Sequence, residues 1–301
     1  MTHEVQGEEW WIGRIIGKGT ESLDEKRYGK PQAMRKRGLT VLGMAAILAW
    51  LGGCTTGLSV DRSYQARGQD SRVRFIVLHY TSESTPDSLR ILTRQPVSAH
   101  YLISDEPVRV YGLVDENRRA WHAGTSNWFG YKDLNAMSIG VEIVNAGPLD
   151  AAGTRWAPYS AAQMQTLKQL LHEIQSRHHV KPWNIVAHSD IAPLRKTDPG
   201  PAFPWRELAR DGLGRWFDEN AVAQRAPFVS AAQINDAGYV QDLLTRIGYP
   251  VQRTGIWDAQ TRQVLRAFQM HYRSADVSGT ADGESLAIAE NLAQQLPAGD
   301  D

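Results

Sequence analysis

Two short apolar segments most constrain how this chain can fold. They are Phe75–Leu78 and Ile185–Ala187, and a histidine directly follows each of them, His79 and His188. A strand without polar alternation is buried on both faces, typically in the middle of a sheet. The two segments therefore predict two core strands that carry their histidines at one end of the same sheet.

The loop after His188 adds a carboxylate to these two imidazoles. Lys196 and Asp198 lie near its end, directly before a Pro-Gly-Pro sequence. Imidazole and carboxylate groups bind divalent metals, zinc above all, and two histidines with one aspartate leave a fourth tetrahedral position for water. The other interpretation is structural, with His188 ending a strand and Asp198 capping a helix that begins near Trp205.

Two further residues have the chemistry of a hydrolytic site. Glu142 lies in an apolar segment, residues 139–144, and burial of an ionised carboxylate is costly unless a charge, a metal or a functional cleft is near. Lys196 is close enough in sequence to Asp198 to reach over a metal. The alternatives are an edge strand that turns Glu142 to solvent and a solvated loop lysine.

Several blocks of sequence resemble the type-2 N-acetylmuramoyl-L-alanine amidases, in the branch that includes AmpD and AmiD. They occur in the same order and with compatible spacings between about residue 72 and about residue 218. The blocks are His79, Ser98–Ile103, Arg119–Gly124, Ser138–Ile143 and His188–Asp198. The resemblance implies a fold shared with the peptidoglycan recognition proteins.

The resemblance also implies an activity. One Zn²⁺ per chain would be held by His79, His188 and Asp198, Glu142 would act as general base, and Lys196 would stabilise the oxyanion. The reaction would hydrolyse the amide between N-acetylmuramic acid and L-alanine of the stem peptide in peptidoglycan. Two alternatives remain, a non-catalytic peptidoglycan-binding lipoprotein and a zinc peptidase acting within the stem. Equal numbers of basic and acidic residues, 33 each, give no electrostatic reason to expect nucleic acid as a partner.

Five residues are candidates for substrate binding. An aromatic loop around residues 127–131 could stack on a sugar ring or on the stem peptide, although aromatic clusters also form cores. The candidates are His100, Trp121, His122, Asn127 and Trp128. His100, at the start of a strand, either lines the cleft or belongs to the core. Tyr80 is not among them, because neighbouring residues on a strand face opposite ways.

One histidine pattern is not a metal site. His172 and Glu173 begin a sequence similar to H-E-x-x-H, but Ser176 occupies the position of the second histidine. The helix cannot offer two imidazoles one turn apart. We therefore expect His172 and Glu173 on an exposed helix face.

The order of predicted elements indicates an α/β (α+β) fold with a mixed central β-sheet flanked by helices. We expect a strand at residues 74–80, a hairpin formed by 100–104 and 108–114, and strands at 138–144 and 184–187. A helix is predicted from Thr85 to about Arg94, and a longer one over 160–178 with Ser160 as its cap.

The N-terminal part has the pattern of a lipoprotein signal. Met34 is interpreted as the natural start. After it, a basic segment and an apolar run at residues 39–51 lead to Leu51-Gly-Gly-Cys54, which matches a lipobox. Residues 1–53 are interpreted as an upstream extension and signal peptide, Cys54 as the lipidated residue, and 54–71 as a flexible tether. The expected location is the periplasm of a Gram-negative bacterium, lipid-anchored to the membrane, and Thr55 favours the outer membrane. The alternative is an uncleaved anchor.

The C-terminal part is predicted to be a second module. With 301 residues and 42% hydrophobic content the chain can form two cores. We expect the zinc amidase domain at residues 72–218, a linker at 219–229, and a small three-helix domain at 230–297. The last of these resembles the peptidoglycan-binding domain found beside many wall hydrolases. A packing domain without a ligand is the alternative.

Overall fold

The computed structural model describes residues 58–296. The predictions for Met34, the signal peptide and Cys54 therefore lie outside the described residues. Residues 66–296 belong to one compact unit. Among the described residues, none of the helices has the length and apolar character needed to cross a membrane.

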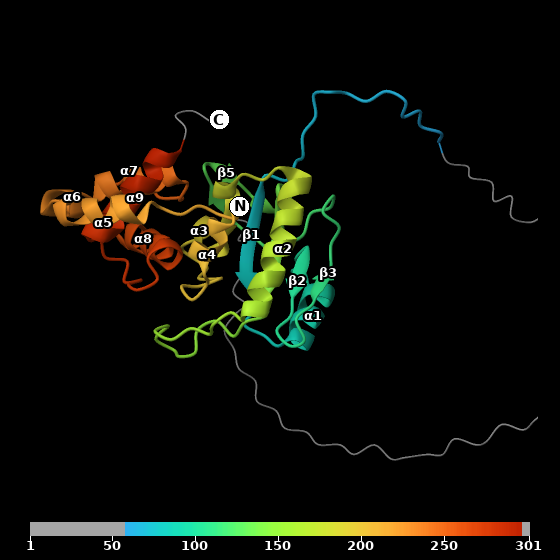
Figure 1. The fold of residues 1–301 in the computed structure, drawn as a ribbon, viewed down its shortest axis with the longest axis horizontal. Helices are drawn as coiled ribbons and strands as arrows, with labels where there is room; N and C mark the ends of the chain where they lie inside the picture. Colours follow the sequence, from blue (N-terminus) through green and yellow to red (C-terminus); the bar gives the residue numbers. More distant parts are fainter. Residues whose placement is uncertain (1–57, 297–301) are drawn as a thin grey trace, which may run out of the picture. The chain divides into compact units, whose positions relative to one another are not determined.

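Five strands form one mixed sheet in the order β3-β2-β6-β1-β7 (Figure 1). β2, β6, β1 and β7 run parallel to one another, and β3 pairs with β2 as an antiparallel hairpin. The predicted mixed sheet is thus confirmed, and the two strands that end in histidine are neighbours. The expectation that both lie in the middle of the sheet is wrong for the strand at residues 185–187, which forms one edge of the sheet although its residues are buried. The strands are β1 (Phe75–Tyr80), β2 (Tyr101–Ile103), β3 (Val110–Gly112), β6 (Ser138–Ile143) and β7 (Ile185–Ala187).

One face of this sheet is covered by the long helix α2 (Ala161–His178), which lies alongside β1 in Figure 1. The helix begins at Ser160, whose side chain accepts the N–H of Gln163 in a capping box. Its buried residues recur at helical spacing and pack against one set of alternating strand residues, which includes Ile76 and Val141. The other set, which includes His79 and Glu142, must face away from α2.

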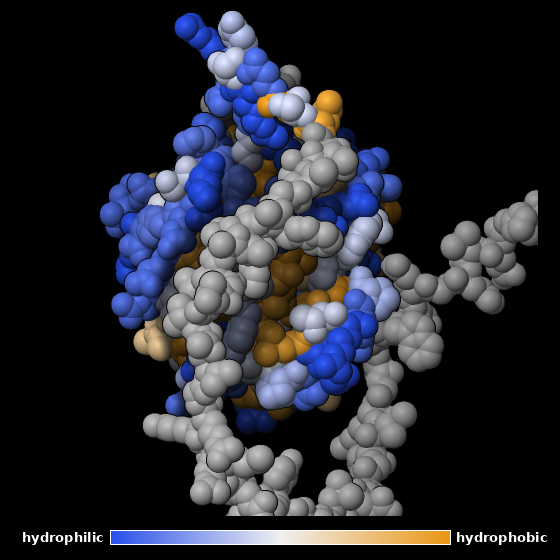
Figure 2. Space-filling view, turned by 90° about the vertical axis from the view of Figure 1, so that its right-hand side faces the viewer, coloured by the Kyte–Doolittle hydropathy of each residue, from blue (hydrophilic) through white to orange (hydrophobic). Residues whose placement is uncertain are grey.

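The remaining helices and strands between residues 85 and 210 are short. They are α1 (Thr85–Arg94), the two-stranded hairpin β4 (Asn127–Trp128) and β5 (Tyr131–Lys132), the 3₁₀ turns η1 (Leu134–Ala136) and η2 (Pro182–Asn184), and the helices α3 (His188–Ile191) and α4 (Trp205–Arg210). On the face shown in Figure 2, hydrophilic residues dominate the rim and hydrophobic residues gather toward a hollowed centre.

The C-terminal part consists of helices joined by turns, and most of the segment predicted as a linker is itself helical. Residues 219–228 form α5 and η3, which pack against α9. Val222 is buried, and Arg225 forms an ion pair with Glu290 of α9, so apolar and ionic contacts hold this segment in place. The elements are α5 (Glu219–Arg225), η3 (Ala226–Phe228), α6 (Ala231–Asn235), α7 (Ala237–Ile247), α8 (Ala259–Tyr272) and α9 (Gly283–Gln295).

Two similar turns precede α8 and α9. Each contains a glycine with a φ of 73°, Gly255 and Gly279, which a residue with a side chain rarely adopts. The N–H of each glycine donates to a buried glutamine of the preceding helix, Gln241 at 2.9 Å and Gln269 at 2.7 Å. An aspartate three residues after each glycine caps the next helix. The second turn thus has the same geometry as the first.

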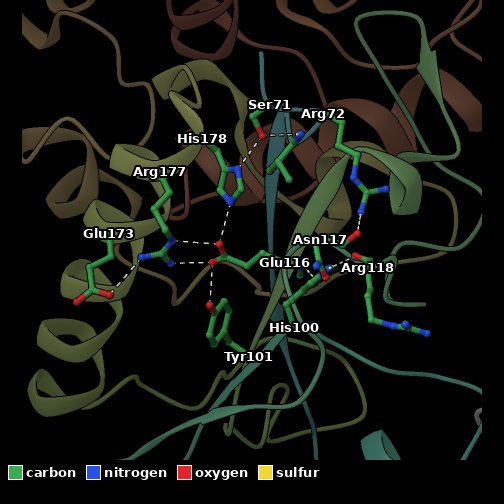
Figure 3. A network of polar contacts seen from close by, with 12 residues as sticks. Ser71, Arg72, His100, Tyr101, Glu116, Asn117, Arg118, Glu173, Arg177 and His178 are labelled. Carbon is green, nitrogen blue, oxygen red and sulfur yellow. Dashed lines mark hydrogen bonds and ion pairs between the residues drawn. The ribbon is translucent and has the colours of Figure 1, made fainter. Parts of the chain in front are cut away.

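A polar network at one edge of the sheet attaches α2 to the hairpin side (Figure 3). Glu116 accepts hydrogen bonds from Tyr101 at 2.7 Å, from Arg177 at 2.7 and 3.0 Å, and from His178 at 2.8 Å. His178 in turn bonds to Ser71 at 2.7 Å. Burial raises the pKa of Glu116, but the donors from Arg177, His178 and Tyr101 outweigh it and lower the pKa to about 2.

Glu116→Gln is expected to make the protein less stable in a pH-dependent manner. The pKa of Glu116 falls from 4.5 to about 2 on folding, so its carboxylate stabilises the fold above pH 4.5 and loses this contribution as the pH falls toward 2. After allowance for solvent screening we expect a difference of about 2 kcal/mol at neutral pH. Urea unfolding at a series of pH values measures it, with exposed Glu106→Gln as the control. A difference that does not shrink in acid would contradict the assignment.

Candidate metal centre

Three neighbouring strands bring the candidate residues together. β1 lies between β6 and β7, and in its parallel pairing with β6 the residue opposite His79 is Glu142. On the other side Leu78 pairs with Ala187, so the next residues along, His79 and His188, are also neighbours. Register alone therefore places Glu142, His79 and His188 at one end of the sheet.

The three predicted ligands converge on one point. His79 Nδ1 lies 2.9 Å from Asp198 Oδ2 and 3.0 Å from His188 Nδ1, and His188 Nδ1 lies 3.0 Å from the same Asp198 oxygen. Ligand atoms around a tetrahedral zinc lie about 3.3 Å apart. Within residues 58–296 these three residues form the one group of three or more ligand side chains with mutual spacings below 4.8 Å. The donor set and its spacing fit a divalent metal.

The charge states of two of these groups also suit a metal. Burial, together with the neighbouring His188, lowers the pKa of His79 to about 4, so its ring is neutral at physiological pH and has a free lone pair. Burial opposes ionisation of Asp198, but His188 and His79 hold the pKa of its carboxyl well below the usual range. The centre therefore offers a neutral imidazole and a carboxylate to a cation.

The outer nitrogens of both histidines are engaged, which orients the rings. His188 Nε2 donates to the carbonyl of Ala123 at 3.1 Å, and His79 Nε2 contacts His122 Nδ1 at 3.1 Å. His122 Nε2 lies 3.2 Å from Ser138 Oγ, which donates to the Leu134 carbonyl at 2.6 Å, a bond that leaves the Ser138 oxygen as an acceptor. In this series of hydrogen bonds, His79 Nε2 therefore donates to His122 Nδ1, and His122 Nε2 donates to Ser138 Oγ. Nδ1 of His79 is left without a proton and faces the centre.

His122 therefore lies against the outer nitrogen of His79. The sequence analysis had instead expected His122 to contact the substrate. A glycine makes this placement possible, because a Cβ at Gly140 would lie 2.4 Å from the His122 ring. Burial and the neighbouring His79 hold the pKa of His122 well below its ordinary value, so the ring stays neutral. These contacts give His122 a role in orienting His79, and because the residue is still partly exposed, its contact with substrate stays a prediction.

His122→Ala is expected to lower zinc affinity by about 10- to 100-fold, the usual cost of losing a hydrogen-bond partner of a metal ligand. Competition with a chromogenic chelator measures the change. His172→Ala removes an exposed imidazole from α2 and should leave zinc affinity unchanged. Equal affinity in the two variants would refute the orienting role.

Glu142 and Lys196 both lie beside the centre. Glu142 Oε2 is buried and has no hydrogen-bond partner among the described residues. Burial and then the charge of Asp198 raise the pKa of Glu142 well above its ordinary value, while the positive charge of Lys196 acts in the opposite direction. Lys196 itself is half buried. A buried carboxylate without a donor is costly, and its position beside the centre gives it access to a proton there.

Two of the five substrate-binding candidates lie in the core instead. His100 is 0% exposed, and its two ring nitrogens contact the N–H of Gly140 at 3.0 Å and the Arg118 carbonyl at 3.2 Å. Trp128 is 2% exposed and packs edge-on against Tyr249 at 5.0 Å. Both side chains belong to the core, because hydrogen bonds within the protein hold His100 and aromatic packing holds Trp128.

Two further candidates, Trp121 and Asn127, are accessible. Trp121 is 50% exposed, with the Arg119 guanidinium 4.0 Å from its ring. Asn127 accepts the N–H of Gly130 at 3.1 Å. It lines a cavity of about 580 Å³ together with residues 191–195 of the metal loop, the segment from His188 to Asp198, and residues 250–252 of the C-terminal part.

Sequence reasoning missed residues that hold the loops of the centre. Asn135 Oδ1 accepts the N–H groups of His122 at 3.0 Å and Ala123 at 2.8 Å, and Tyr80 bonds to Thr197 at 3.0 Å. These contacts join segments distant in sequence, and no periodic pattern marks them. His172 and Glu173 are exposed, as predicted.

Comparison with known proteins agrees with this geometry. A sequence model described as N-acetylmuramoyl-L-alanine amidase matches residues 69–201, and one for a peptidoglycan binding domain matches residues 235–288. The chain is 42% identical over 250 residues to N-acetylmuramoyl-L-alanine amidase AmiD of Escherichia coli, a match that covers 79% of this chain and 89% of AmiD.

Solved structures are similar as well. The complex of E. coli AmiD with the substrate anhydro-N-acetylmuramic acid-L-Ala-D-γ-Glu-L-Lys has a TM-score of 0.72 at 41% identity, covering 79% of this chain and 95% of that chain. AmpDh3 from Pseudomonas aeruginosa has a TM-score of 0.72 at 37% identity, covering 80% of this chain and all of that one. The mixed sheet with flanking helices and a helical C-terminal region is the fold of these proteins.

Proposed function

Because this chain belongs to the N-acetylmuramoyl-L-alanine amidase family, we propose that it is a zinc-dependent hydrolase that cuts the amide between N-acetylmuramic acid and L-alanine of the stem peptide in peptidoglycan. The observation that carries the proposal is the convergence of His79, His188 and Asp198 within about 3 Å of one another. The substrate in the AmiD complex contains the same bond.

His79, His188 and Asp198 would hold one zinc ion, with their outer contacts keeping both imidazoles aimed at it. When bound, the zinc would polarise the scissile carbonyl and lower the pKa of a coordinated water toward neutrality. Zinc is favoured over harder cations because two of the three ligands are imidazole nitrogens.

Glu142 and Lys196 would supply the remaining chemistry. The unpartnered Glu142 Oε2 is the group that takes the proton of the attacking water and passes it to the leaving amine nitrogen. Lys196, whose positive charge acts on Glu142, stabilises the negative charge that develops on the carbonyl oxygen. Trp121 and Asn127 remain the proposed contacts for substrate.

Mass analysis of digested cell wall tests the proposal against its rivals. The zinc-loaded protein should release intact stem peptides that begin with a free L-alanine amine. Trimmed stems would identify a peptidase acting within the stem, and binding without release would identify a non-catalytic peptidoglycan-binding protein. Either of these results would overturn the amidase assignment.

The flanking segments would keep the enzyme at the wall. Residues 235–288 match a peptidoglycan binding domain, which supports wall binding by the C-terminal module. A lipid on Cys54 followed by a tether would anchor the protein in the periplasm, at the outer membrane. Residues 58–70 agree with a tether, because they are exposed and contain no helix or strand.

Cys54→Ala is expected to abolish the lipid anchor, because the thiol is the proposed attachment site. Incorporation of a labelled fatty acid by the full-length protein, followed by membrane fractionation, measures the loss. A Cys54→Ala protein that still carries the label would contradict the assignment of this cysteine.

A further inference from the structure

A buried carboxylate joins the metal loop to the C-terminal helices. Asp190 is 0% exposed and lies in α3, two residues after His188. Its Oδ1 accepts the hydroxyl of Tyr249 at 2.6 Å, and its Oδ2 accepts His271 Nδ1 at 2.7 Å. Both donors come from the C-terminal part, Tyr249 from the segment after α7 and His271 from α8.

The same carboxylate belongs to the backbone turn that presents His188. Asp190 Oδ2 also accepts the N–H of Ala187, the last residue of β7, at 2.8 Å. This bond spans the junction where β7 ends and α3 begins with His188. The N–H of Ser189 donates to the carbonyl of Asp198 at 2.9 Å. A shift of Asp190 would therefore move the backbone on both sides of His188. It would also disturb the hydrogen bond between Ser189 and Asp198.

The two donors are fixed by packing. The His271 ring stacks on Trp205 of α4 at 3.9 Å, and the Tyr249 ring meets Trp128 of β4 at 5.0 Å. All four of these side chains are buried. A carboxylate at this depth is costly unless its oxygens accept hydrogen bonds. Loss of either donor would leave Asp190 under-bonded, and the turn would have to rearrange.

We infer that the C-terminal helices position the metal-binding loop, with Tyr249 and His271 acting through Asp190 as positioning residues for His188. The inference rests on the proposed metal site, and it gives residues 235–288 a second role besides wall binding. A module that served only to retain the enzyme on the wall would need no buried hydrogen bonds beside a metal ligand. Figure 1 shows α8 near α3 and α4, which it contacts.

Tyr249→Phe tests the inference, because it removes one hydroxyl and keeps the packed ring. We expect zinc affinity to fall about tenfold, which is the lower end of the effect of losing a hydrogen-bond partner of a metal ligand. We also expect kcat to fall, whereas KM and the retention of the protein on insoluble peptidoglycan should stay unchanged. Tyr239→Phe is the matched control, since that hydroxyl donates at 2.7 Å to Glu290 within the C-terminal helices. The control should bind zinc like the unmodified protein.

A second pair of variants separates positioning from general stability. His271→Leu removes the donor to Asp190, whereas His271→Asn can place an amide N–H near the position of Nδ1. We expect zinc affinity to fall in the leucine variant and to recover in the asparagine variant. If melting temperatures fall while zinc affinity does not, His271 has only a structural role and the inference is overturned.

The unmodified protein, assayed in parallel, distinguishes the two proposals. If it retains no zinc, the proposed metal site fails. If it binds zinc and releases stem peptides, and Tyr249→Phe and His271→Leu bind zinc equally tightly, the inference fails while the proposed function stands.

Discussion

His188→Ala is expected to release the metal and abolish hydrolysis. Two ligands, His79 and Asp198, would remain, and Asp198 would keep one of its two histidine contacts. The metal contributes several kcal/mol of transition-state stabilisation, so its loss should lower the rate by on the order of a thousandfold or more. Metal analysis of the purified protein and release of stem peptides measure the two effects.

His172→Ala is the matched control, because it removes an exposed imidazole from α2. It should retain both metal and activity. Substantial hydrolysis by His188→Ala would refute the assigned centre. Metal loss in both variants would mean that the metal was bound nonspecifically to surface histidines.

Glu142→Gln should separate proton transfer from metal binding. The substitution keeps the size of the side chain and removes its basic oxygen, and general acid–base catalysis contributes about 10²- to 10⁴-fold. We expect kcat to fall by this amount while the bound metal is retained, since Glu142 is not among the three converging ligands.

The control for Glu142→Gln is Glu173→Gln on the exposed face of α2, which should behave like the unmodified protein. The amide can also satisfy the buried site without a charge, so Glu142→Gln should be at least as stable as the parent. Unimpaired kcat in Glu142→Gln would exclude the carboxylate as the base. Loss of metal together with activity would mean that Glu142 is needed to build the centre.

Much of the sheet and of its ligand set could be predicted because the signals are local. An apolar segment followed by histidine occurs at both β1 and β7, and parallel pairing brings the ends of such strands together. The start of α2 could also be predicted, since Ser160 caps this helix with its own side chain. These features depend on the backbone and on neighbouring residues only.

The errors arose where distance in sequence hides a contact. His100 and Trp128 carry side chains that suit a binding cleft, yet internal partners bury both. Residues 219–229 were expected to be a linker, but α9 offers Val222 an apolar surface and Arg225 a carboxylate. In each case a partner supplied by the folded chain decided between exposure and burial.

The sequence by itself determined that two apolar strands end in histidine at the same end of one sheet and which three side chains can bind a metal there. Only the tertiary structure decided what holds those side chains in place. Asp190 meets Tyr249 and His271 across separations of 59 and 81 residues, and His79 meets His122 across 43. Strand and helix patterns arise from the backbone geometry of adjacent residues, whereas such contacts depend on how whole elements pack, and no local pattern encodes them.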